Sequence, residues 1–182
     1  MQLRPDIQIQ TVIKAMMEDV IPAMDQTNQL AMQSAQLTIG TLTMIAQHLP
    51  LAYRFDCDEL SRLVDTAKLL KEQADGGSQT TVAVDNLKLA QAVAEDVLSR
   101  AKAEPGEILD AIRTLRSATG DTVRAVYEEG AEQVIKTVES TVLNSSKQQL
   151  VRDRSWLLMQ GWEPDPASVP AIESLLPAIA KG

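Results

Sequence analysis

The stretch from residue 26 to residue 53 carries no formally charged side chain, and this constrains the fold more than any other feature. Neutral polar residues recur along it at spacings of four and three, which is the period of an α-helix and not of a β-strand. They are Gln29, Gln33, Gln36, Gly40, Thr43 and Gln47. Apolar rows flank this polar row on both sides, and such a helix contacts neighbours on more than one side. We therefore expect a long, uncharged central helix.

Two interpretations of the glutamine stripe, formed by Gln29, Gln33, Gln36 and Gln47, remain open. It is either a partly solvated edge of the helix or an uncharged seam used in self-association. A helix that crosses a membrane needs about 20 mostly apolar residues. Because the glutamines interrupt the apolar character of this stretch, we expect no membrane span.

The composition favours an all-α fold. Aromatic residues make up only 3% of the 182 residues, so the core is built from aliphatic side chains and alanine. Such a core suits closely packed helices better than sheets, which use large cross-strand pairs. A chain of this length can bury a substantial core. We expect one domain over residues 1–182, a mixed bundle of about six to seven helices.

Apolar spacing and terminator residues give the expected helix boundaries. Pro22 and Pro50 are expected to end the first and the central helix, Gly120 to separate two later helices, and Gly161 to end the second of these. A loop near residues 75–81 is expected to separate an N-terminal three-helix unit from the rest. Besides the central helix, the spacing predicts helices over residues 6–21, 56–74, 84–101, 107–119, 123–158 and 168–180. We expect the apolar face of the first helix to dock on the central one.

Charge and cysteine content narrow the functional classes. The net charge is −8, and no run of Lys or Arg forms the basic patch that phosphates require, so we expect no nucleic-acid partner. The one cysteine, Cys57, excludes an internal disulfide framework and fits a reducing compartment. No signal peptide is recognisable at the N-terminus. These features predict a cytoplasmic protein.

The motifs that usually carry chemistry in helical bundles are missing from the sequence. A di-metal carboxylate site needs Glu three residues before His on two helices, whereas the single histidine, His48, has no such glutamate. Glycine-rich phosphate loops do not occur either. We expect no metal, no cofactor and no catalytic residue.

Two loci nevertheless gather side chains that are rare in this chain. The first holds His48, Tyr53, Arg54 and Cys57, which we expect to lie in a loop after the central helix. A nucleophilic cysteine needs a base within hydrogen-bonding reach and a lowered thiol pKa. Because aspartates flank Cys57 on both sides and disfavour a thiolate, a loop that is pinned structurally is the main alternative.

The second locus contains both tryptophans, Trp156 and Trp162, on either side of Gly161. Two large rings can fasten a C-terminal segment to the bundle. They can also line a pocket or anchor a partner, since tryptophan is enriched at binding hot spots. Together with His48, Tyr53, Arg54 and Cys57, they are our candidates for pocket or partner contacts.

The first third of the chain resembles a bacterial family of small all-helical proteins of uncharacterised function. The resemblance covers residues 1–55 and lies in Arg4-Pro5-Asp6, in the segment from Glu18 to Met24, which contains Val-Ile-Pro-Ala-Met, and in the small-residue helix that follows. The chain departs from the family pattern at residues 30–34. Members are often encoded near phosphotransferase-like kinases and acyl-CoA dehydrogenases. The resemblance implies an accessory role without an established reaction.

These features predict a non-catalytic helical accessory or protein-interaction module that self-associates as a homo-oligomer or binds another protein. An uncharged helix with two apolar flanks, together with the lack of a catalytic constellation, favours this function. The alternative is a small-molecule-binding protein or an enzyme. Its pocket would lie near the C-terminal tryptophan segment or the loop over residues 48–57.

Overall fold

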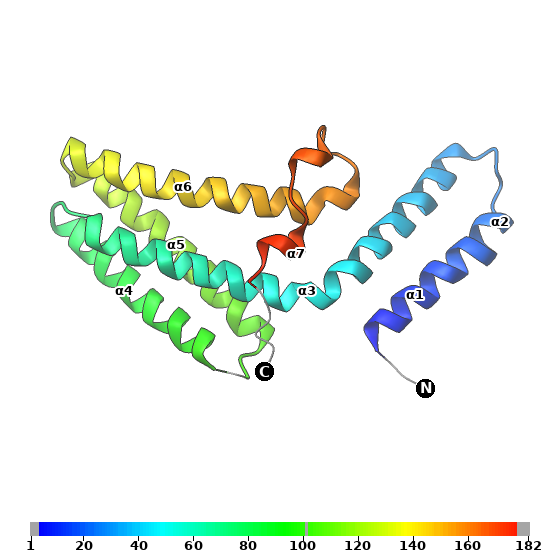
Figure 1. The fold of residues 1–182 in the computed structure, drawn as a ribbon, viewed down its shortest axis with the longest axis horizontal. Helices are drawn as coiled ribbons and strands as arrows, with labels where there is room; N and C mark the ends of the chain where they lie inside the picture. Colours follow the sequence, from blue (N-terminus) through cyan, green and yellow to red (C-terminus); the bar gives the residue numbers. More distant parts are fainter. Residues whose placement is uncertain (1–3, 101, 178–182) are drawn as a thin grey trace. The chain divides into compact units, whose positions relative to one another are not determined.

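The structure is a computed structural model that describes residues 4–100 and 102–177. Every regular element in these ranges is a helix, so the predicted all-α fold is confirmed (Figure 1). No helix among them is both long enough and apolar enough to cross a bilayer. In chain order the elements are α1 (Pro5–Ala15), η1 (Met16–Val20), α2 (Ile21–Ala23), α3 (Gln29–Gln73), α4 (Ser78–Ser99), α5 (Pro105–Glu129), α6 (Glu132–Leu157), η2 (Leu158–Gln160), η3 (Pro166–Ser168) and α7 (Ile172–Leu175).

The chain divides into two compact units, and each is described by itself. The first unit contains Met1–Tyr53 and Arg154–Pro170, and the second contains Arg54–Asp153 and Ala171–Gly182. Both α3 and α6 therefore contribute to both units.

The first helical segment matches the range expected from the sequence, with one local adjustment. Pro5 lies in the first turn of α1, where a missing N–H is harmless. Pro22 comes later, and its ring crowds the carbonyl four residues earlier. The chain widens into the π-helix η1 just before this proline, and the backbone N–H of Ile21 donates to the carbonyl of Met16. A π turn relieves the conflict and lets the helix continue into α2.

The expectation that Pro50 ends the central helix is wrong, because α3 runs through it. A proline inside a helix removes one hydrogen bond and costs about 3 kcal/mol. Beyond it, Leu60, Val64 and Leu70 of the same helix are buried. Each such side chain contributes about 1.5 to 3 kcal/mol on burial. The packing of the second half of α3 thus outweighs the local preference of one proline.

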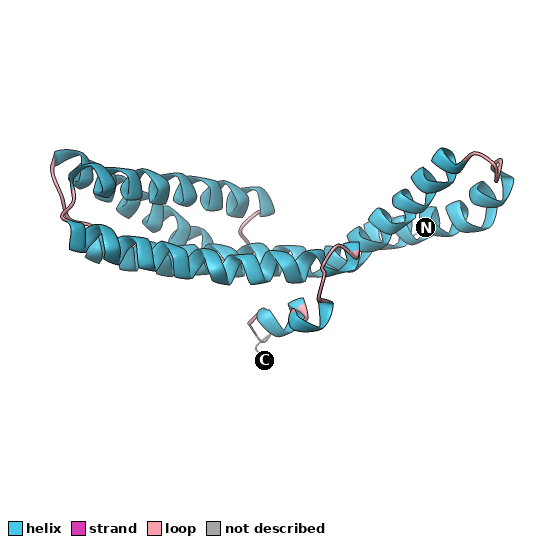
Figure 2. Ribbon diagram, turned by 90° about the horizontal axis from the view of Figure 1, so that it is seen from above, coloured by secondary structure: helices cyan, strands magenta, loops and turns pink. Residues whose placement is uncertain are grey.

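The second unit contains the main core. The second half of α3 runs beside α4, α5 and α6, and loops occur only at the connections (Figure 2). Aliphatic side chains from these four helices form one cluster. Its fully buried large members are Leu60, Leu70, Leu87, Ile108, Leu115, Val126 and Val138. The core is therefore aliphatic, as the low aromatic content predicts.

Gly120 does not end a helix, contrary to the expectation, because α5 continues past it. A glycine costs about 1 kcal/mol in a helix interior, but its neighbours Ala118 and Thr122 are buried and hold the helix in place. The break occurs instead at Gly130. A Cβ there would lie 2.6 Å from the carbonyl oxygen of Val126, so the close approach at this position requires glycine.

The loop expected near residues 75–81 is shorter in the structure: residues 74–77 connect α3 to α4, and residues 78–81 form the first turn of α4. Glu129, the last residue of α5, caps the start of α4. Its carboxylate accepts hydrogen bonds from the backbone N–H of Thr80 (2.8 Å) and of Gln79 (3.3 Å). These bonds lower the pKa of Glu129. A Cβ on Gly77 would lie 2.8 Å from this carboxyl group, so the glycine leaves room for the cap.

The last expected helix, over residues 168–180, is much shorter in the structure. Only α7 forms within it, and residues 178–180 lie outside the described part of the chain. Val169 and Leu176 are extended (ψ 121° and 143°). Each precedes a proline, Pro170 or Pro177, and a residue before proline is pushed out of the helical region. The two prolines thus confine the helix to a single turn.

Candidate interaction surface

The helical hairpin of residues 5–53 contains almost no buried side chain. None of the residues of α1, η1 or α2 is buried, and within residues 29–53 of α3 Ala35 alone is buried. Helices of soluble proteins usually cover one apolar face. Here the large apolar side chains that are 41–74% exposed are Ile7, Val12, Met17, Val20, Leu30, Leu37, Ile45, Leu49 and Tyr53. We call this set the hairpin surface.

Side chains in the turn between α2 and α3 hold the hairpin together. The carboxylate of Asp25 accepts hydrogen bonds from the backbone N–H (2.9 Å) and the hydroxyl (2.7 Å) of Thr27, which lower its pKa. The side chain of Asn28 accepts the backbone N–H of Ala31 at 3.1 Å, an N-cap of α3. With this turn, α1 runs back along the first half of α3 (Figure 1).

The apolar face of α1 is only partly covered within this hairpin. Ile9, Ile13 and Met16 are half-buried, which fits the expected docking of the opening helix on the central one. Val12 and Val20 belong to the same apolar pattern but are 48% and 43% exposed. Two helices therefore do not suffice to cover the apolar side chains of this segment.

A row of apolar side chains follows the side of α3 at heptad spacing. Every seventh residue is Leu or Met, with a smaller or polar residue between, as in a coiled-coil seam. In order, the members are Leu30, Ser34, Leu37, Thr41, Met44, His48 and Leu51. We call this row the α3 stripe. Its first half is exposed, with Leu30 at 74% and Leu37 at 69%, whereas Met44, His48 and Leu51 are half-buried.

Residues near the end of α6 cover the second half of the α3 stripe. The ring of Trp156 stacks on His48, with 4.0 Å between the ring centroids and 25° between the planes. The side-chain amide of Gln160 donates to the sulfur of Met44 at 3.6 Å. Trp162 remains 78% exposed. The structure thus brings together His48 and Trp156, two predicted candidates from separate loci, and places the second tryptophan at the surface.

Polar contacts hold this covering segment in shape. The guanidinium of Arg154 donates to both carboxylate oxygens of Glu163 (2.9 and 2.8 Å) and lowers the pKa of that carboxyl group. The hydroxyl of Ser155 donates to the carbonyl of Pro170 at 2.7 Å. Gly161 has a φ of 72°, a left-handed conformation that glycine adopts easily, and it ends the helical run as expected. The segment is therefore a defined part of the first unit.

The glutamine stripe predicted from the sequence lies on the outside of the hairpin. All four of its residues are exposed. Each lies within one helical turn of a residue of the α3 stripe. They add hydrogen-bonding groups without charge beside the exposed leucines. The stripe consists of Gln29, Gln33, Gln36 and Gln47.

Residues 48–57 form part of a helix and not the expected loop, because α3 continues through Pro50. Tyr53 is 43% exposed and, like His48, belongs to the first unit. Arg54 and Cys57 belong to the second unit. Arg54 donates to the backbone carbonyl of Pro177, and Cys57 packs, half-buried, against the apolar core. The expected cluster is thus divided between two units.

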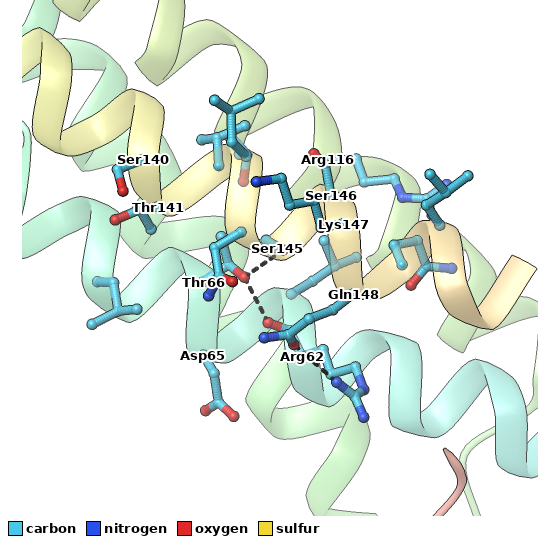
Figure 3. Close-up of a pocket in the computed structure, with 18 of the residues that line it drawn as sticks. Arg62, Asp65, Thr66, Arg116, Ser140, Thr141, Ser145, Ser146, Lys147 and Gln148 are labelled. Atoms are coloured by element: carbon cyan, nitrogen blue, oxygen red, sulfur yellow. Dashed lines mark hydrogen bonds between the residues drawn. The ribbon is translucent and has the colours of Figure 1, made fainter. Parts of the chain in front are cut away.

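Sequence reasoning missed a line of polar contacts between α3 and α6 in the second unit. This polar seam borders a groove of about 1110 Å³ that α5 also lines (Figure 3). The contacts join Gln73 with Thr141 (2.7 Å), Thr66 with Ser145 (3.0 Å), Arg62 with Gln148 (3.1 Å), Glu59 with Gln149 (3.4 Å), and Asp58 with Arg152. Hydrogen bonds therefore hold α6 on α3 from Thr141 to Arg152, in addition to the apolar packing of Val138 and Val142.

Arg152 is the largest buried side chain in this seam, with 1% of its surface exposed. Its guanidinium pairs with Asp58 and donates to the carbonyl of Phe55 at 3.3 Å, and it lies 4.6 Å from the centroid of the Phe55 ring. Arg62 also donates to Asp58, at 3.0 Å. The sequence carries one signal of this burial: Arg152 stands two heptads after Val138, on the core-facing row of α6.

Glu59 is the second buried charge of the seam and forms an ion pair with Arg116 at 2.7 Å. Burial raises the pKa of Glu59, and the nearby Asp153 and Asp56 raise it further, while Arg116 acts in the opposite direction. The folded state consequently binds a proton at Glu59 more tightly than the unfolded state. The stability that Glu59 contributes is complete below its unfolded pKa and declines as pH rises through the folded pKa.

Substituting Glu59→Gln tests this direction. The variant cannot ionise at this position, so its stability relative to the wild type should increase between about pH 4 and pH 7. Urea unfolding at both pH values measures the difference. Glu129→Gln is the control of opposite sign. Because the pKa of Glu129 is lowered, the stability of the wild type relative to that variant should increase over the same pH range. A relative stability of Glu59→Gln that falls with rising pH would contradict the assignment.

The exposed apolar side chains of the hairpin surface are suited to docking. Among the described residues, no three His, Cys, Asp or Glu side chains come together to hold a metal ion. The ionisable groups of the polar seam are largely paired with one another. The large apolar side chains of the hairpin surface, in contrast, are exposed to water, and covering them is favourable.

No family model matches the sequence. Comparison with curated proteins finds no match either, and no solved structure matches the chain. The functional interpretation therefore depends on the hairpin surface, the α3 stripe and the polar seam themselves.

Proposed function

We propose that this chain is a non-catalytic, cytoplasmic accessory protein that works as a protein-interaction module, and that the hairpin surface is its docking face. One observation carries the proposal. Among the described residues up to Tyr53, Ala35 is the single buried residue, while aliphatic side chains on both helices are exposed. Contiguous exposed apolar surface on a soluble protein is typical of an interaction site.

The energetics of the two units support this proposal. The second unit has an aliphatic core that stabilises its helices. The hairpin of the first unit has no comparable core, and helices in water gain most of their stability from packing an amphipathic face. Covering one exposed leucine contributes about 1.5 to 3 kcal/mol. Leu30 and Leu37, on the exposed half of the α3 stripe, offer the largest gain to a partner.

The class of partner follows from charge and composition. The net charge of −8 and the lack of a basic run disfavour nucleic acid, so the partner is a protein. The single thiol, Cys57, fits the reducing cytoplasm. The resemblance of residues 1–55 to a family of helical proteins of uncharacterised function also supports an accessory role.

Photo-crosslinking inside native cells tests the docking face. A benzophenone amino acid replaces Leu37 in one variant and Leu89 in another, and the full-length protein is irradiated and resolved on a denaturing gel. The two leucines are matched, at 69% and 68% exposed, but Leu89 lies on α4 in the second unit. We expect discrete protein adducts from position 37 and far weaker ones from position 89. Equal labelling, or no adduct from position 37, would overturn the proposed function.

A further inference from the structure

The exposed half of the α3 stripe alternates large and small side chains. Leu30 and Leu37 are 74% and 69% exposed, and Ser34 and Thr41 follow them at the next seam positions, also exposed. Spacings of four, three and four residues place all four on one side of the helix. Small residues let another helix approach closely, and the leucines supply apolar surface. This part of α3 is therefore suited to receive a helix.

The same stripe already carries a packed contact further along the chain. Trp156 stacks on His48 and Gln160 contacts Met44, so the second half of the stripe is covered within the first unit. The exposed half continues that contact surface toward the start of α3. A partner that binds there extends an interface that is already partly built.

Charge identifies the partner. The chain has a net charge of −8, so two copies repel one another over most of their surfaces. Residues 26–53 have no formally charged side chain. Two copies that meet at this stretch place no like charges opposite each other, whereas a partner selected by its positive charge would find no complementary group here.

Side-chain size identifies the orientation. In an antiparallel pair of α3 helices, a two-fold axis between Ala35 and Gln36 places Leu37 opposite Ser34 of the second copy. The same axis places Leu30 opposite Thr41 of the second copy, so each large side chain meets a small one. A parallel pair would set leucine against leucine and serine against serine, with crowding at one level and a gap at the next.

We infer, building on the proposed function, that the partner at the exposed half of the α3 stripe is a second copy of this chain, docked antiparallel. The paired surface is shorter than the roughly 20–30 residues per side of a standard interface. The dimer is therefore weak and reversible, with a dissociation constant on the order of 10 to 100 μM. Its formation depends on protein concentration.

Sedimentation velocity of the full chain, at concentrations from about 5 to 300 μM, tests this inference. We expect a shift from monomer to dimer for the wild type. The Leu30→Glu/Leu37→Glu variant brings four carboxylates into the seam and should weaken association by at least about 100-fold. Leu89→Glu alters an equally exposed leucine outside the stripe and should dimerise like the wild type.

The outcomes separate this inference from the proposed function. A wild type that stays monomeric at the highest concentration overturns the dimer, as does a dimer that the double substitution leaves unchanged. If position 37 nevertheless crosslinks to a different protein in cells, the docking face remains and only the partner is wrong. A monomer that co-floats with phospholipid vesicles would show a membrane to be the partner and would also overturn the dimer.

Cysteine crosslinking tests the orientation in a Cys57→Ser background. Ser34→Cys lies three positions from its counterpart in the proposed antiparallel register, about 4.5 Å along the axis, and Thr41→Cys lies eleven positions away, about 16 Å. We expect a short bifunctional maleimide to join two copies of Ser34→Cys efficiently and two copies of Thr41→Cys poorly. Equal yields indicate parallel helices, and no crosslink at either position excludes pairing through this stripe. Both results overturn the inference.

Discussion

Replacing Asp58 with Asn is expected to lower the free energy of unfolding by about 3 to 5 kcal/mol, because the guanidinium of Arg152 then stays buried without its carboxylate partner. Arg152 is 1% exposed and Asp58 8%. The Nε atom of Arg152 already lacks a hydrogen-bond partner among the described residues, and neither the carbonyl of Phe55 nor the amide oxygen introduced at position 58 carries the charge that balances the guanidinium. Urea denaturation of the variant at neutral pH, followed by circular dichroism, measures the loss.

A second substitution separates the buried charge from other effects of changing Asp58. Adding Arg152→Met removes the unpaired charge and keeps an unbranched apolar side chain of similar length, so the double variant should recover about 2 kcal/mol or more. Asp110→Asn, which changes an aspartate of α5 that is 75% exposed and pairs with Arg113, is the mock control. A loss below about 1 kcal/mol for Asp58→Asn would contradict the buried pair.

Truncating Leu87 to Ala is expected to cost about 3 to 5 kcal/mol, because it removes a fully buried side chain and leaves a cavity in the aliphatic core. Leu89, two residues later on the same helix, is 68% exposed, and Leu89→Ala should change the stability by no more than about 0.5 kcal/mol. Both variants have the same helix propensity change, so the comparison isolates burial. Thermal and urea unfolding of the pair measure the difference.

Either leucine can contradict this account of the second unit. A small effect of Leu87→Ala means that the cluster formed by α3, α4, α5 and α6 does not pack as described. A large effect of Leu89→Ala means that α4 is covered in solution by something other than this chain. The second result would also make Leu89 unsuitable as the control for the hairpin surface.

The helical architecture is predictable from the sequence because the apolar period of three to four residues persists through most of the chain. Individual helix boundaries were harder to predict. Pro50 and Gly120 are usual terminators, yet both lie inside helices. Packing of their neighbours decides these positions, since Leu60 and Thr122 are buried on the continuing segments. A local rule worth about 1 to 3 kcal/mol fails where tertiary burial contributes more.

The site was predictable in part. The uncharged stretch indicates a surface on α3, and His48 and Trp156 are residue types that are rare in this chain, but nothing in their sequence positions shows that the two rings stack. The buried Asp58–Arg152 pair was missed because both residues carry charge, and charged residues are assigned to the surface unless a partner is known. Pairing between helices far apart in sequence leaves little trace in a single chain.

The exposure of the hairpin surface could not be predicted from a single sequence either. Amphipathic spacing shows which face of a helix is apolar, but not what covers that face. Val12 and Leu37 have the same patterning as the buried Val64 and Leu70, and only the structure distinguishes the exposed pair from the buried pair. The distinction matters because the proposed docking face depends on this exposure.

In-cell photo-crosslinking from position 37 tests this docking face most directly. The account predicts discrete protein adducts from a benzophenone at Leu37, with one adduct of twice the chain mass if the second copy is the partner. The matched position Leu89, equally exposed on α4, should give little. A position 37 that labels no protein, or no more than position 89 does, would contradict the claim that the hairpin surface is where this protein binds its partner.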